Sequence, residues 1–177
     1  MDARTTNASR AAQALFQEHG PAVYRFAVAL LRHHQDAEDV LQETFLKLVD
    51  HLGAGRDAAN LRGWLFTVAA HAARDRQRRR RRWIPWGPEH DPIVPPAGIP
   101  DEDGRVRAVR EVLQRLSPRD RLLLALRAQG LTYREIASAA GVRPASVGKL
   151  LARALDRCAR GGPYEVFERC ADSGGRR

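Results

Sequence analysis

Cysteine is scarce in this sequence. Cys158 and Cys170 are its only cysteines among 177 residues. A disulfide framework needs about four cysteines or more, and a structural zinc site needs about four metal-ligating residues. A reducing compartment fits this composition. The histidines are scattered without metal-ligand spacing, at His19, His33, His34, His51, His71 and His90. We therefore expect no metal site.

Catalytic signatures are missing as well. The sequence has no nucleophile paired with a base, no Walker loop and no dinucleotide fingerprint. We expect a protein without a cofactor that is not an enzyme.

Aromatic residues and long apolar runs are few. Aromatics make up 6% of the chain, and no segment alternates β-branched with polar residues, which argues against a β-sandwich or barrel. No stretch approaches the roughly 18 apolar residues that span a bilayer, and the N-terminus lacks the apolar segment of a signal peptide. Because 44% of the residues are hydrophobic, the chain can still bury a core. These features predict an all-α, cytoplasmic protein without membrane insertion.

Lysine is nearly absent, although the chain is strongly basic. Lys47 and Lys149 are the only lysines among 30 basic residues, and the net charge is +9. Such an arginine-rich surface attracts polyanions, with nucleic acid or an anionic membrane surface as the two alternatives.

Proline divides the chain. Six of the ten prolines fall within residues 83–104, and a helix cannot run through such a segment. We expect a first helical domain over 1–82, a flexible linker over 83–104, a second helical domain over 105–160 and a loose tail over 161–177.

The first domain shows four helical patterns. A short helix over 11–18 is expected to end at Gly20, and Pro21 is expected to begin the next one. A third helix is predicted from Asp36, and a fourth over 61–82 continues into an arginine run. The second domain has cap signals at Ser117, followed by Pro118, and a capping box at Thr132 and Glu135. Gly141 is expected to end that helix, and Pro144 to begin the last one.

The last two predicted helices have the proportions of a helix-turn-helix. The outer face of the last helix repeats polar residues every three or four positions, at Arg143, Ser146, Lys149, Arg153 and Arg157. A cationic helix with an apolar back indicates a DNA-binding surface. The alternative is an ordinary helical hairpin with a solvated basic face.

Two further charge patterns are candidate binding sites. Seven arginines occupy the nine residues from Arg74 to Arg82, which favours contact with nucleic acid over a solvated tail or a membrane patch. Asp36, Asp39 and Glu43 share one helix face with Gln42 beside them, and no internal partner is recognisable. Helix-dipole placement explains the first two acids, but the whole face suggests a protein partner.

The sequence resembles the small extracytoplasmic-function sigma factors of bacterial RNA polymerase. The resemblance lies in Asp36-Ala-Glu-Asp-Val-Leu-Gln-Glu-Thr-Phe-Leu46, in Leu61-Arg-Gly-Trp-Leu-Phe-Thr-Val-Ala69, and in Leu116-Ser-Pro-Arg-Asp120 followed by the helix-turn-helix. Where many members read Val-Lys-Ser-Arg-Leu in the last helix, this chain reads Val147-Gly-Lys-Leu-Leu151.

The resemblance implies two small helical domains that bind core polymerase and promoter DNA. It implies that Asp39, Gln42 and Glu43 dock on the clamp helices of the largest polymerase subunit. The residues implied for the melted minus-ten element are Arg56, Asp57, Asn60, Arg62, Trp64, Thr67, His71 and Arg74. Those implied for the minus-thirty-five element are Arg143, Ser146, Lys149, Arg153 and Arg157. An anti-sigma factor is a further implied partner. The alternative function is a helix-turn-helix regulator that acts without polymerase.

Overall fold

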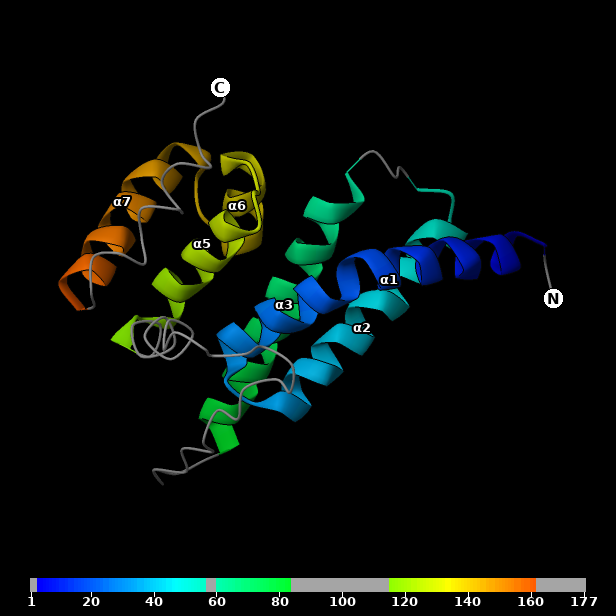
Figure 1. Ribbon diagram of the computed structural model, residues 1–177, viewed down its shortest axis with the longest axis horizontal. Coiled ribbons are helices and arrows are strands. Elements are labelled where there is room, and N and C mark those ends of the chain that lie inside the picture. The colour runs from blue at the N-terminus through cyan, green and yellow to red at the C-terminus, as the bar shows by residue number, and fades with distance from the viewer. Residues whose placement is uncertain (1–2, 57–59, 84–114, 162–177) are drawn as a thin grey trace, which may run out of the picture. The chain divides into compact units, whose positions relative to one another are not determined.

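The computed structural model describes residues 3–56, 60–83 and 115–161. The chain divides into two compact units, Met1–Asp91 and Pro92–Arg177. The first unit contains the long helices α1, α2 and α3, and the second contains α5, α6 and α7 (Figure 1). Their bounds are α1 Ala3–Leu31, α2 His34–Gly53, α3 Leu61–Trp83, α5 Pro118–Ala128, α6 Tyr133–Ala140 and α7 Pro144–Gly161.

All regular structure in the described segments is helical, which confirms the all-α prediction. The predicted linker after Trp83, the first part of the predicted second domain up to residue 114 and the predicted tail from residue 162 lie outside the described residues. Within the described segments, no helix combines the length and apolarity needed to cross a bilayer.

The prediction of two helices before residue 32 was wrong, because α1 runs unbroken through Pro21. An interior proline removes one backbone hydrogen bond and costs about 3 kcal/mol in an isolated helix. Packing of α1 against α2 supports the helix on both sides of Pro21. On the N-terminal side, the Phe16 ring meets the Phe45 ring edge-on at 4.9 Å, and on the other side Val23 is fully buried. Gly20 is also buried, and a β-carbon at this position would lie 3.5 Å from the Phe16 ring.

The start of α2 also differs from the prediction. The helix begins at His34 rather than at Asp36, and His33 is its N-cap. The Nδ1 atom of His33 accepts a hydrogen bond from the backbone N–H of Asp36 at 3.2 Å. Asp36 therefore lies in the first turn, where its charge complements the helix dipole. The chain reverses between α1 and α2 at Arg32, whose φ of 58° is left-handed.

α3 crosses the α1–α2 pair and completes the core of the first unit (Figure 1). Phe66 of α3 is fully buried and meets the Phe26 ring edge-on at 5.3 Å. Near the other end of α3, the Gln77 side-chain amide donates to the carbonyl oxygen of Leu30 at 2.9 Å. The arginine-rich part of α3 is thus anchored to the end of α1.

The second unit confirms each of its predicted helix ends. Ser117 caps α5 through the N–H of Asp120, with Pro118 at the first helical position. Thr132 and Glu135 form the capping box of α6. Gly141 ends α6 with a left-handed φ of 67°, a conformation that costs glycine little. α7 then begins at Pro144.

A charged pair fastens α7 to the start of α5. Arg157 donates from Nε to Asp120 Oδ2 at 3.0 Å and from a terminal nitrogen to Oδ1 at 3.1 Å. The Ser117 hydroxyl donates to the same Oδ2 at 2.8 Å. The Asp120 side chain is 7% exposed and that of Arg157 is 52% exposed. The buried carboxylate therefore forms a two-point ion pair with the Arg157 guanidinium.

We predict that Asp120→Asn will destabilise the second unit by about 1 to 3 kcal/mol, because the amide cannot accept both guanidinium hydrogen bonds. Hydrogen exchange of the α7 amides measures this loss. Asp156→Asn, which removes an exposed acid from α7, is the matched control. Equal protection of α7 in the two variants would contradict the prediction.

Candidate functional site

The acidic face on α2 consists of Asp39, Gln42 and Glu43. The structure corrects the expectation that these acids have no internal partner. A terminal nitrogen of Arg76, on α3, lies 2.7 Å from Glu43 Oε2, and its other terminal nitrogen lies 4.0 Å from Asp39 Oδ2. Lys47, one turn further along α2, donates to Glu43 Oε1 at 2.7 Å. Glu43 is therefore held between two cations.

These cations change the chemistry of the two acids differently. Hydrogen bonds from Lys47, the larger cause, and from Arg76 lower the pKa of Glu43, although partial burial opposes the shift. The Asp39 side chain is 47% exposed and lies at the limit of ion-pair distance from Arg76. Asp39 and the exposed Gln42 are thus the members of the acidic face that are most accessible to a partner.

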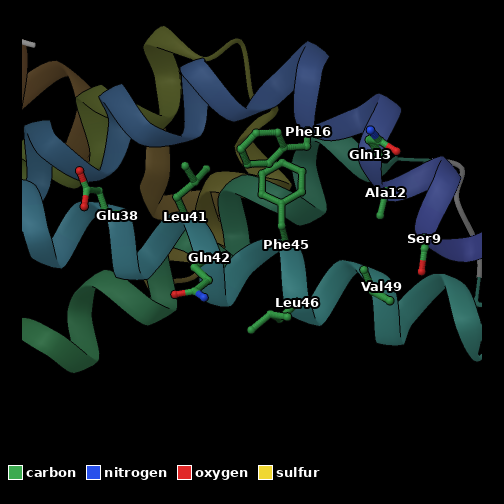
Figure 2. Close-up of a pocket in the computed structure, with 10 residues that line it drawn as sticks. All are labelled: Ser9, Ala12, Gln13, Phe16, Glu38, Leu41, Gln42, Phe45, Leu46 and Val49. Carbon is green, nitrogen blue, oxygen red and sulfur yellow. The ribbon is translucent and has the colours of Figure 1, made fainter. Parts of the chain in front are cut away.

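An apolar groove of about 370 Å³ lies beside the acidic face, between α1 and α2 (Figure 2). Leu46 and Phe16, on its opposite walls, are 60% and 45% exposed. Gln42 belongs to both the groove and the acidic face. The sequence pattern does not predict the groove, because it places Phe16 in a separate short helix. Its lining residues are Ser9, Ala12, Gln13, Phe16, Glu38, Leu41, Gln42, Phe45, Leu46 and Val49.

The N-terminal half of α3 carries most residues expected to contact the melted strand. Trp64, Thr67, His71 and Arg74 recur every three or four positions and share one side of the helix. His71 is exposed, and the other three are half-buried. Trp64 stacks against His51 of α2 with ring centroids 4.6 Å apart. This contact restrains the half-buried indole.

Several of these candidate residues also have structural contacts. The Asn60 side chain accepts from the N–H of Gly63 at 3.1 Å and caps α3. The Thr67 hydroxyl donates to the Gly63 carbonyl at 2.8 Å. The Arg62 guanidinium lies 5.9 Å from the centre of the Phe66 ring. Asn60 is therefore needed for the helix itself, whatever it does with a ligand.

The loop before α3 is described only in part. Arg56 is exposed, and its N–H donates to the carbonyl of His51 at 3.3 Å. Asp57 lies outside the described residues.

Further along α3, the pKa of Arg74 is lowered. Burial is the larger cause and the charge of Arg78 is the smaller one, while Asp75 opposes the shift. Arg78 and Arg79 are exposed.

The predicted recognition face consists of Arg143, which directly precedes α7, and of Ser146, Lys149 and Arg153 on α7. All are exposed except Ser146, which is half-buried. Arg157 was predicted to belong with them, but its guanidinium is engaged by Asp120. Leu150 is half-buried, so it adds less apolar surface than the sequence suggests. Val147 and Leu151 form the buried back of the helix.

The described residues contain no cluster of three or more side chains that could ligate a metal ion. The candidate site consists of charged, aromatic and apolar surfaces, and such surfaces are suited to binding macromolecules.

The comparisons with known proteins agree with this arrangement. Residues 15–83 match the family model of sigma-70 region 2, and residues 106–158 match that of sigma-70 region 4. The RNA polymerase sigma factor CarQ of Myxococcus xanthus is 32% identical over 133 residues, which cover 73% of this chain and 76% of CarQ. The ferric citrate uptake sigma factor FecI of Escherichia coli is 31% identical over 171 residues, covering 89% and 94%.

A solved structure shares the fold. It is the sigma factor RpoE of Bartonella quintana in complex with the anti-sigma factor NepR, with a TM-score of 0.66 and 24% identity. The match covers 84% of this chain and 94% of RpoE.

We predict that removing either cation will raise the pKa of Glu43, with Lys47→Ala acting more strongly than Arg76→Ala. Because the folded pKa is lowered, Glu43 contributes stability above its unfolded pKa and loses it as the pH falls through the folded value. Carboxyl carbon shifts in an NMR titration measure both variants. Arg78→Ala, an exposed arginine on the same helix as Arg76, should leave Glu43 unchanged. An unchanged pKa in Lys47→Ala would disprove the pairing.

Proposed function

The chain belongs to the extracytoplasmic-function family of RNA polymerase sigma factors, and from this premise we propose how its surfaces bind core polymerase and promoter DNA. The proposed domains are 1–82 for core and minus-ten binding and 105–160 for minus-thirty-five binding, joined by 83–104. The observation that carries the proposal is that an acidic face, a basic aromatic helix and a cationic recognition face follow one another in the family's order. A polymerase-independent regulator is not favoured, because it leaves the match of the first unit to sigma-70 region 2 unexplained.

We propose that the acidic face and the adjoining apolar groove together receive a helix of the polymerase clamp. Asp39 and Gln42 supply polar contacts, and Leu46 and Phe16 supply apolar area. Glu43, which is already paired with Lys47 and Arg76, orders the face and contacts the partner as part of this network. A partner with both basic and apolar side chains fits such a surface.

The minus-ten contacts are assigned to the loop before α3 and to one side of that helix. An aromatic ring with neighbouring cations can stack on unpaired bases and bind their phosphates. Trp64, held by His51, is the proposed stacking residue. The proposed contacts are Arg56, Asp57, Asn60, Arg62, Trp64, Thr67, His71 and Arg74.

The minus-thirty-five contacts are assigned to α7. Arg143 directly precedes the helix, and Ser146 and Lys149 come early in it. Residues at these positions of a recognition helix reach base edges. Arg153 lies later, where phosphate contact is expected, and Arg157 is a weaker candidate because Asp120 holds it. We further propose that the chain acts in the cytoplasm without catalytic activity of its own, and that an anti-sigma factor binds it, as NepR binds RpoE.

The test of this function is transcription. The purified chain is expected to direct runoff transcription by core polymerase from a random promoter library, and Asp39→Arg should abolish this by weakening assembly. We expect a loss of about 2 to 5 kcal/mol in core binding, because the reversed charge opposes the basic partner. A pull-down with core polymerase measures the affinity, and circular dichroism should show unchanged helicity.

The matched control is Asp50→Arg, which reverses another exposed acid on α2. It should keep nearly the parent affinity. If both variants bind core as the parent does, the acidic face is not the dock. A chain that shifts duplex DNA but gives no transcript with core would support the regulator instead.

On α7, we predict different effects from early and late residues. Lys149→Ala should relax base preference at one or two minus-thirty-five positions, with a loss of about 1 to 3 kcal/mol on the preferred sequence. Arg153→Ala should weaken all promoters similarly and reduce the salt slope by about one. Sequencing of transcripts from the library measures both. A uniform loss in both variants would leave specificity to the first domain.

A further inference from the structure

Tyr133 is an exposed aromatic residue that does not belong to the proposed polymerase-binding or DNA-binding surfaces. It is the first residue of α6, and it remains 49% exposed. Its ring packs on α7 at Gly148. A β-carbon at Gly148 would lie 3.4 Å from the ring atom Cε2 and 4.0 Å from the hydroxyl oxygen. The phenol therefore covers the surface from which a side chain at position 148 would project.

A third helix contributes to this contact. The guanidinium carbon of Arg127, in the last turn of α5, lies 5.8 Å from the centre of the Tyr133 ring. This is within the range of a cation–π interaction. Arg127 and Gly148 thus both lie against the ring, and Arg127 places a positive charge next to it.

The position of Gly148 on α7 decides what the hydroxyl can reach. Consecutive residues of a helix are about 100° apart. Gly148 therefore lies on the flank between the buried Val147 and the exposed Lys149. When a helix lies in the major groove, its front meets base edges and its flanks face the phosphate walls. Ala145 and Ala152, the exposed neighbours of this flank, have no polar side-chain atom.

We propose that the Tyr133 hydroxyl donates a hydrogen bond to a phosphate oxygen at the edge of the minus-thirty-five major groove. Arg127 adds positive charge beside the same phosphate. A small residue is required at position 148, because a large side chain there would displace the ring. Tyr133 thus replaces the side chain that α7 lacks at position 148. The inference rests on the proposed assignment of α7 as the recognition helix.

The test uses full-length protein with core polymerase on a promoter selected from the random library. Neutral methylphosphonates replace the phosphates of the minus-thirty-five duplex one at a time. The parent protein should lose affinity at several positions. Tyr133→Phe keeps the ring and removes the hydroxyl, and it should weaken binding to the unmodified promoter about tenfold to 150-fold, because a hydrogen bond to a charged group is lost. At one position to which the parent is sensitive, neutralising the phosphate should then cost clearly less affinity than it does in the parent, because only the attraction of Arg127 remains to be lost.

Two substitutions at Gly148 provide a matched pair. Gly148→Ala should bind as the parent does, because its β-carbon makes an ordinary contact with the ring. Gly148→Leu should displace the ring and reproduce the pattern of Tyr133→Phe, including the reduced sensitivity at the same phosphate. Unchanged helicity by circular dichroism is expected in all three variants.

The outcomes separate this inference from the function on which it rests. If Tyr133→Phe keeps the parent affinity and the same sensitive phosphates while Lys149→Ala alters base preference, the phosphate contact is refuted and α7 remains the recognition helix. If neither the methylphosphonates nor Lys149→Ala has any effect, the assignment of α7 is refuted together with the contact.

Discussion

The first unit depends on the burial of one side of α2 between α1 and α3. Val40, Thr44 and Leu48, spaced one turn apart, are completely shielded from solvent. Thr44 remains satisfied there, because its hydroxyl donates to the Val40 carbonyl at 2.7 Å. Residues on the opposite side of the same helix must then face outward. This burial is what presents Gln42 and Leu46 as a surface.

The same packing brings α3 close enough for its charges to act on α2. Arg76 reaches the acidic face, and Arg157 makes a comparable contact with Asp120 in the second unit. These two arginines form ion pairs with acids of the protein itself. The count of 30 basic residues therefore overstates the number of cationic side chains that are free to contact DNA. Substituting a paired arginine is expected to change stability as well as binding.

Local signals predicted the second unit well. The caps at Ser117 and Thr132 and the left-handed glycine at Gly141 formed as expected, because each depends on hydrogen bonds within about four residues. The same reasoning failed at Pro21. The local preference for a break was real, but contacts made on both sides of the proline outweigh the loss of one hydrogen bond. Tertiary packing thus overrode a correct local tendency.

The sequence by itself determined the helical class, the ends of the short helices and which residues share a helix side, since these follow from interactions between near neighbours in the chain. Only the tertiary structure decided which charges are paired. Arg76 and Glu43 are 33 residues apart, and Arg157 and Asp120 are 37 apart. The groove and the contact of Tyr133 with Gly148 were likewise decided there. Helical periodicity fixes the direction of a side chain around its own axis, but the partner it meets depends on how the helices cross.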